Sequence, residues 1–176
     1  MPQPRANSRE RILSAAAEVA RETGPGSVSL DAVAQRAGVS KGGLLYNFPS
    51  KAKLMQALVA SYIDNFDRAL EEAVATGEPL ITAYLRLSAE AAETDEPAAW
   101  IFSAIAEDPN FLDPVRLHRR NLLDRLKAQS PDEADILVAV MAIEGMLAMK
   151  LFDTQLLGKD ERRMLIERLS RIAAGA

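Results

Sequence analysis

The sequence lacks the residues on which most catalytic and metal sites depend. It contains no cysteine and a single histidine, His118. Without cysteine the chain can form no disulfide, no thiolate zinc site and no cysteine nucleophile. One histidine provides neither a multi-histidine metal site nor a Ser-His pair unless a partner chain contributes. Because Arg119 and Arg120 follow it, His118 is expected at the surface or in an interface rather than as a base. We therefore predict no enzyme, no catalytic residue, no cofactor and no metal.

The sequence also has no apolar run long enough to cross a membrane. The most apolar stretch, Ile136–Met149, contains Glu144 and is shorter than the roughly 20 residues that a membrane-spanning helix needs. The first ten residues are polar and do not resemble a targeting segment. These features predict a soluble, cytoplasmic chain with no membrane partner.

Acidic residues outnumber basic residues overall, but the N-terminal part of the chain has an excess of basic residues. The formal net charge is −4. Through Lys53 the chain has eight Lys/Arg and four Asp/Glu, a net of +4, whereas the rest has thirteen and twenty-one, a net of −8. Only the part of a protein that meets phosphate has to be basic. The N-terminal part is therefore the candidate for binding a nucleic acid.

What the sequence does contain is a helix-turn-helix pattern, between residues 28 and 53, which read VSLDAVAQRAGVSKGGLLYNFPSKAK. Ser29 is placed to cap a short helix, and Gly38 supplies the positive φ that ends it. Ser40 is placed to cap a second helix beginning at Lys41. The first helix has its apolar residues at three- and four-residue spacing: Leu30, Val33, Ala34 and Ala37. Two short helices joined by a glycine turn present a helix end to the DNA major groove.

The rest of the chain also has helical periodicity, with no alternating strand pattern, so the predicted fold class is all-α. A helix is expected over Arg9–Glu22 and a longer one over Ser50–Thr76. Their apolar stripes are, respectively, Ile12, Leu13, Ala16, Val19 and Ala20, and Leu54, Leu58, Tyr62, Phe66, Leu70 and Val74. Further helices are expected over Leu80–Glu93, Pro97–Glu107, Asn110–Ala128, Pro131–Phe152 and Asp160–Ala173. Ser130 is predicted to cap the fourth of these.

Residues from about Ser8 to Met55 resemble the DNA-binding domain of the TetR/AcrR family of bacterial transcriptional regulators. The resemblance rests on several features in order: the leading amphipathic helix, Val28-Ser29-Leu30, Ala34-x-x-Ala37-Gly38-Val39-Ser40, the aromatic Phe48, and Ser50-Lys51 opening a long helix. Many members carry a tyrosine three residues before the Phe48 position and a histidine directly before it. This chain has Leu45 and Asn47 there, and its tyrosine is Tyr46.

The resemblance implies an N-terminal three-helix helix-turn-helix domain, residues 1–53, and a C-terminal helical effector-binding and dimerisation domain, residues 54–176. It implies a homodimer that acts on a palindromic operator in double-stranded DNA as a ligand-responsive repressor. The alternative is an all-helical protein-interaction module that does not bind DNA.

The candidate DNA-binding residues are Ser29, Ser40, Lys41, Gly42, Gly43, Tyr46, Asn47 and Lys51. Lys51 and the start of its helix would clamp a phosphate. Gly42 and Gly43 either let the backbone approach DNA or reflect fraying of a short helix. Tyr46 either donates to phosphate or packs under the first helix. Arg5, Arg9 and Arg11 either contact the DNA backbone or lie in solvent at the start of the first helix.

Two further sites are expected in the C-terminal part. The helix over Pro131–Phe152 is apolar on nearly all sides, so it is either a central core helix or a dimer face. The dimer candidates are Met141, Gly145, Ala148, Leu165 and Leu169. The effector-pocket candidates, for which plain core is the alternative, are Tyr84, Trp100, Phe102, Phe111 and Met141. Such a lining predicts a hydrophobic or amphipathic small molecule.

Overall fold

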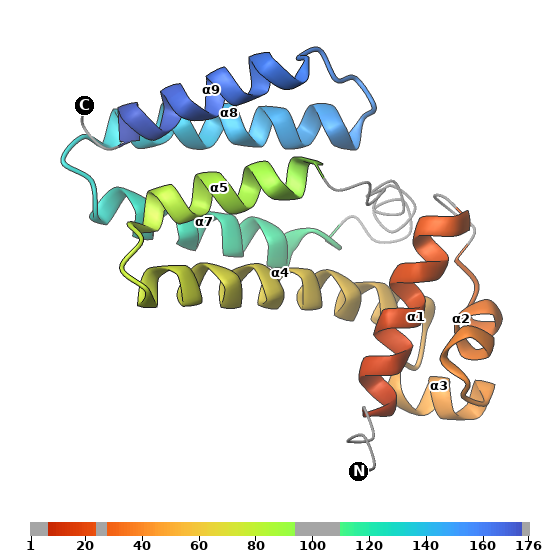
Figure 1. The fold of residues 1–176 in the computed structure, drawn as a ribbon. Coiled ribbons are helices and arrows are strands. Elements are labelled where there is room, and N and C mark those ends of the chain that lie inside the picture. The colour runs from red at the N-terminus through yellow and green to blue at the C-terminus, as the bar shows by residue number, and fades with distance from the viewer. Residues whose placement is uncertain (1–6, 24–27, 94–109, 174–176) are drawn as a thin grey trace, which may run out of the picture. The chain divides into compact units, whose positions relative to one another are not determined.

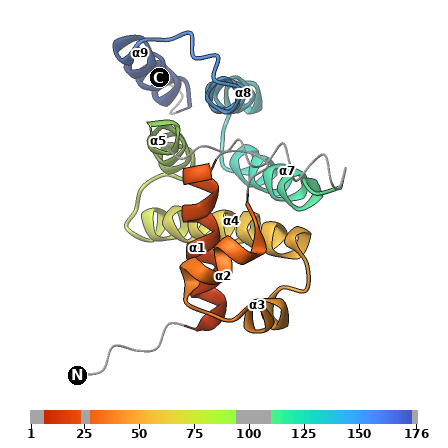
Figure 2. The same ribbon diagram turned by 90° about the vertical axis from the view of Figure 1, so that its right-hand side faces the viewer.

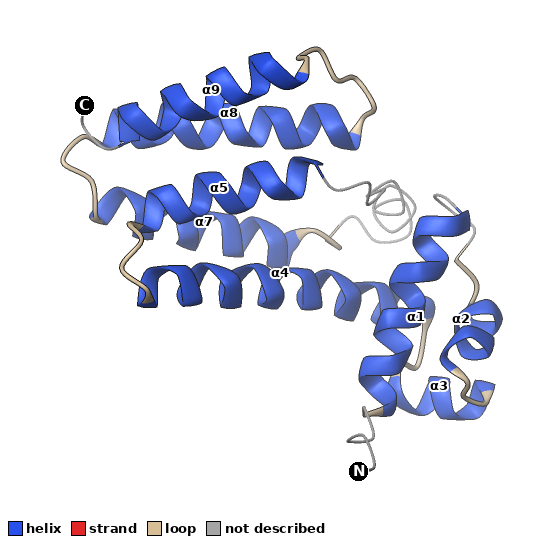
Figure 3. Cartoon of the chain, in the orientation of Figure 1, coloured by secondary structure: helices blue, strands red, loops and turns tan. Residues whose placement is uncertain are grey.

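The computed structural model describes residues 7–23, 28–93 and 110–173, and all regular structure within these ranges is helical (Figures 1 and 3). The all-α prediction is confirmed. The helices are α1 (Ser8–Thr23), α2 (Leu30–Ala37), α3 (Lys41–Asn47), α4 (Lys51–Ala75), α5 (Leu80–Glu93), α7 (Asp113–Ala128), α8 (Glu133–Leu151) and α9 (Lys159–Ala173). The helix expected over Pro97–Glu107 lies outside the described residues. None of the helices in these ranges is long and apolar enough to cross a membrane.

The chain divides into two compact units. The first comprises Met1–Tyr62 with Glu96–Pro114, and the second comprises Ile63–Asp95 with Val115–Ala176. The boundary between the units falls within α4, which is therefore one continuous helix shared by both. The sequence predicts a different division, into a DNA-binding domain before residue 54 and an effector-binding and dimerisation domain after it. Because that division describes function and the compact units describe packing, it stays a prediction.

The first unit is built around α1, which packs against α2 and α3 (Figure 2). The five residues predicted as the buried stripe of α1 are all buried, and Val33 of α2 and Leu44 of α3 are fully covered as well. The stripe of α1 lies along one side because its members recur every three or four residues, close to the 3.6-residue period of the helix. This small core holds the helix-turn-helix in place.

In the second unit, α5 packs against both α8 and α9, and these two pack against each other. The helices α5, α8 and α9 are seen nearly end-on in Figure 2, so their axes are roughly aligned. The core cluster draws on every helix of the unit. Its members are Leu70, Leu80, Ala83, Tyr84, Leu85, Leu122, Leu126, Ile136, Ala139, Val140, Ile143, Met146, Leu169 and Ala173.

One local prediction about these helices is wrong, and one apolar repeat is only partly buried. The N-cap of α8 is Asp132, whose Oδ1 accepts from the backbone N–H of Ala134 at 2.8 Å. Ser130 instead uses its hydroxyl in a local turn with the backbone N–H and carbonyl of Asp132. In α4, Val74 is 40% exposed although it continues the four-residue repeat. Each four-residue step advances about 40° around a helix, so a strict repeat rotates off the buried side.

Candidate nucleic-acid interface

The turn between α2 and α3 has the geometry that its sequence predicts. Ser29 Oγ accepts from the backbone N–H of Ala32 at 3.1 Å and so caps α2. Gly38 ends α2 with a φ of 63°, a left-handed conformation that glycine adopts without steric cost. Ser40 Oγ accepts from the N–H of Gly43 at 3.0 Å and caps α3. The predicted caps and turn are confirmed.

Arg11 fixes this turn to α1, a role that the sequence does not reveal. Its Nη2 donates to the carbonyl oxygens of Ala37 at 2.9 Å and Gly38 at 3.2 Å. The last carbonyls of a helix have no intrahelical donor, so a cationic side chain there satisfies them and opposes the negative helix end. Arg11 is therefore engaged within the protein although it is exposed.

A second arginine joins α2 to α1 on the surface. Arg36 Nη1 lies 3.2 Å from Glu18 Oε2 and 2.8 Å from Glu22 Oε1. The hydrogen bond from Arg36 lowers the pKa of the Glu22 carboxyl, and its partners raise the pKa of the guanidinium. Because these groups are exposed, the contribution to stability is small. They add an exposed link between α1 and α2.

The helix α3 has one buried side and one exposed side. Leu44 is buried and Phe48, its C-cap residue, is buried behind it. Arg9 holds its guanidinium carbon 5.5 Å from the centre of the Phe48 ring, a cation–π contact. Tyr46 is 90% exposed, so the alternative that it packs under α1 is wrong. The exposed tyrosine is available to a partner molecule.

The start of α3 gathers four of the candidate DNA-binding residues. The ammonium of Lys41 pairs with Asp31 of α2, at 2.9 Å from Oδ1. Gly43 lies so close to the cap that a Cβ there would meet Ser40 Oγ at 3.3 Å, whereas a Cβ at Gly42 would lie 4.0 Å from it. The close approach of Ser40 Oγ therefore explains why position 43 has no side chain. The sequence alone suggests only DNA approach and helix fraying for this glycine.

The remaining two candidates lie on either side of the next turn. Asn47 Nδ2 donates to the Gly43 carbonyl at 2.8 Å, so this amide supports the end of α3. Lys51 is the first residue of α4 and is half-buried. Ser50 Oγ accepts from the N–H of Lys53 at 3.2 Å and so caps α4. Two capped helix starts, those of α3 and α4, thus occur in the same compact unit.

This geometry agrees with what the chain is similar to. A family profile described as bacterial regulatory proteins of the tetR family matches residues 12–58, and one described as the tetracyclin repressor-like C-terminal domain matches residues 78–174. The chain belongs to the TetR family. The resemblance seen in the sequence is confirmed.

Individual members of the TetR family give the scale of the similarity. The HTH-type transcriptional regulator RutR of Escherichia coli O157:H7 is 32% identical over 124 residues, which are 68% of this chain and 58% of RutR. A TetR-family regulator from Streptomyces coelicolor has a TM-score of 0.75 at 19% identity, covering 96% of this chain and 95% of that one. The multidrug binding protein EbrR, complexed with ethidium, has a TM-score of 0.68 at 22% identity, covering 96% and 99%. At these identities the solved structures show the fold alone.

The effector-pocket candidates of this TetR-family chain are not seen to line one hollow. Trp100 and Phe102 lie outside the described residues. Tyr84 and Phe111 are buried, and they belong to different compact units. Met141 is 57% exposed. Of the candidates that the structure describes, Tyr84 and Phe111 lie in the core and Met141 lies on the surface.

Tyr84 is part of a polar cluster inside the second unit that sequence reasoning missed. Its ring meets Phe66 edge-on at 6.2 Å, and its hydroxyl lies 3.5 Å from Glu144 Oε1. Glu144, the one acidic residue in the apolar stretch, also pairs with Arg119 at 3.0 Å. Burial and the Glu144 charge raise the pKa of Tyr84 well above its usual range. The carboxylate is thus held by neighbours on two other helices.

His118 lies in the same unit and is partly covered. Its Nδ1 is 3.5 Å from Asp67 Oδ2, and its side chain is about one-fifth exposed. The other oxygen of Asp67 is buried with no hydrogen-bond partner. The sequence predicts His118 at the surface or in an interface; within this chain it is partly covered, and its imidazole faces a carboxylate on α4.

The dimer-face candidates separate into an inner and an outer set. Leu169 is only 2% exposed and packs within its own chain, and Leu165 is half-buried against the same core. Met141 and Ala148 are exposed, and a Cβ at Gly145 would meet no atom within 4 Å. These belong to a row on α8 that we call the outer stripe: Leu137, Met141, Gly145, Ala148 and Phe152.

Proposed function

We propose that the chain binds an operator in double-stranded DNA as a homodimer and acts as a ligand-responsive transcriptional repressor in the bacterial cytoplasm. The observation that carries the proposal is the capped helix-turn-helix, whose exposed α3 presents Lys41, Gly42 and Tyr46 outward. Its relatives are named as regulators, and the chain spans 58% of the length of RutR. We propose no enzymatic activity.

The DNA contacts fall into two classes. Lys41 and the backbone at Gly42 and Gly43 would approach base edges, because they lie at the N-terminal end of the recognition helix. Tyr46 and Lys51 would contact phosphate, the latter together with the N–H groups that open α4. Ser29 and Ser40 act indirectly by capping the helices, and Asn47 supports the end of α3 through Gly43.

The outer stripe of α8 supports the dimer. Its residues recur at four, four, three and four positions, which keeps them on one side of the helix. Exposed apolar side chains in such a row cost free energy in water, and a second copy of the same stripe would cover them. A dimer built in this way would read two half-sites about one helical turn, or roughly 34–36 Å, apart.

The effector would bind in the second unit. EbrR is described as a multidrug binding protein and has been solved with imidazole, ethidium and malachite green. By analogy, the apolar core of the second unit would take a hydrophobic or amphipathic small molecule. To release DNA, that molecule must bind more tightly to the conformation that does not bind DNA than to the conformation that does.

Binding of the purified chain to labelled DNA from upstream of its own gene tests the proposal, with fluorescence anisotropy as the readout. Tyr46→Ala and Lys41→Ala should each weaken binding, because both side chains are exposed on α3. Arg163→Ala serves as the matched control, since it removes an exposed cation from α9 in the other unit. Equal affinity in all four proteins, or no binding at low salt, would favour the protein-interaction module instead.

A further inference from the structure

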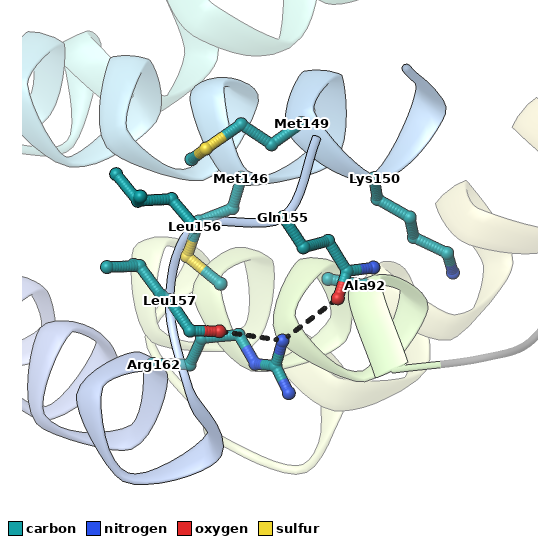
Figure 4. Close-up of a pocket in the computed structure, with 8 residues that line it drawn as sticks. All are labelled: Ala92, Met146, Met149, Lys150, Gln155, Leu156, Leu157 and Arg162. Atoms are coloured by element: carbon teal, nitrogen blue, oxygen red, sulfur yellow. Dashed lines mark hydrogen bonds between the residues drawn. The ribbon is translucent and has the colours of Figure 1, made fainter. Parts of the chain in front are cut away.

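A hollow in the second unit lies between the end of α5, the last turns of α8 and the segment that leads into α9 (Figure 4). Its apolar wall includes Met146, Met149 and Leu156, and its polar groups include Lys150, Gln155 and Arg162. None of these was an effector-pocket candidate. The hollow is therefore separate from the residues predicted to line the effector pocket.

Arg162 is the group that needs an explanation. Its Nη1 donates to Gln155 Oε1 and to the Leu157 carbonyl, both at 3.3 Å, as Figure 4 shows. Its Nε is buried and has no hydrogen-bond partner. Within the part of the chain that the structure describes, no carboxylate pairs with this guanidinium. A buried donor on a charged group is costly when it is left without an acceptor.

The surroundings of Arg162 are positive rather than negative. Lys150 reaches the same hollow and donates to the carbonyl of Ala91, in the last turn of α5, at 2.8 Å. Glu161, one position before Arg162, uses its carboxylate to accept from the backbone N–H of Gly158. Among the described residues that line the hollow, none is acidic. The charge in it therefore favours an anion.

We propose that this hollow binds a small amphipathic carboxylate. The carboxylate accepts hydrogen bonds from the guanidinium of Arg162, because a guanidinium matches a carboxylate in geometry and charge. The apolar part of the ligand lies against Met146, Met149 and Leu156. Methionine suits this role because its unbranched, polarizable side chain adapts to ligands of different shape. The proposal does not depend on whether the chain binds DNA.

Octanoate titrated into the intact chain, labelled with carbon-13 at the methionine methyl groups, tests the proposal. The signals of Met146 and Met149 should shift, while Met55, buried in the first unit, should not. Octanamide, which has the same tail without the charge, should bind at least about tenfold more weakly, as expected for the loss of a charge-assisted hydrogen bond. Benzoate, compared in the same way, distinguishes an aliphatic from an aromatic acid as the preferred form.

The matched variants are Arg162→Gln and Arg163→Gln. The first should raise the Kd for octanoate about tenfold or more, whereas the second should leave it unchanged, since Arg163 is exposed and pairs with Asp160 at 2.8 Å. Because Arg162 also holds the Leu157 carbonyl, Met149→Glu provides a second variant that leaves the guanidinium in place and repels an anion. Equal shifts with octanamide, or unchanged affinity in Arg162→Gln or Met149→Glu, would overturn the proposal.

Discussion

Replacing Gly38 with alanine tests the turn that positions α3. Gly38 has a φ of 63°, and a Cβ there would meet only Arg11 Nη2, at 3.9 Å. Since this is an ordinary contact, the cost comes from the backbone conformation rather than from a clash. A residue with a Cβ pays about 1–2 kcal/mol in the left-handed region. For a chain of this length the melting temperature should fall by about 2–8 °C, measured by far-ultraviolet circular dichroism.

Gly42→Ala is the matched control, because it makes the same chemical change four residues later. Gly42 is helical and exposed, and a Cβ there would lie 4.0 Å from Ser40 Oγ. Alanine in a helix is favoured over glycine, so stability should stay the same or rise by up to about 1 kcal/mol. A Gly38→Ala protein that melts at or above the temperature of Gly42→Ala would refute the left-handed turn.

The same pair of proteins separates the two explanations of the double glycine. If the backbone of α3 approaches DNA closely at Gly42, the Gly42→Ala protein should lose operator affinity despite its unchanged or higher stability. If glycine there only reflects a frayed helix start, affinity should be retained. Gly38→Ala should weaken operator binding in either case, because the turn sets the direction of α3.

Tyr46→Phe should lower operator affinity about two- to tenfold, the value of one hydrogen bond, without changing the melting temperature, because the side chain is 90% exposed. Lys51→Ala should weaken binding to all DNA sequences alike and reduce the salt slope by about one, whereas altered sequence preference would contradict a phosphate contact. Asp31→Asn should release Lys41 and raise nonspecific affinity about two- to fivefold, as expected for an exposed ion pair; a fall would show that Asp31 orients Lys41 productively. Gly145→Arg should leave the fold intact, because no atom lies within 4 Å of its Cβ, yet yield a monomer in sedimentation; a retained dimer would place the interface elsewhere.

The helix-turn-helix could be predicted in detail because its determinants are local. Ser29, Gly38 and Ser40 each satisfy backbone groups within a few positions along the chain. The same rules failed at α8, where Ser130 and Asp132 are both good capping residues. The local sequence alone does not determine which of two suitable N-cap residues, two positions apart, begins the helix.

Long side chains were beyond prediction because their partners are distant in the sequence. Arg11 reaches carbonyls 26 and 27 positions away, and Arg36 reaches back to Glu18 and Glu22. From the sequence, an arginine in the first turn of a basic domain is equally consistent with a DNA contact. The effector candidates stay a prediction for a related reason: an aromatic residue such as Tyr84 has the same pattern in a core as in a pocket wall.

The prediction that α8 is a core helix is confirmed for one of its sides, whereas the dimer face stays a prediction for the other. The helix has an inner apolar set, including Ile136, Ala139 and Ile143, which its own chain buries. At 100° per residue, the outer stripe from Leu137 to Phe152 lies on the opposite side of the helix. A helix with two opposed apolar sides needs two partners, and one chain supplies the first. In the proposed dimer, a symmetric copy would supply the second without any additional protein, since one self-complementary surface would then cover the outer stripes of both copies.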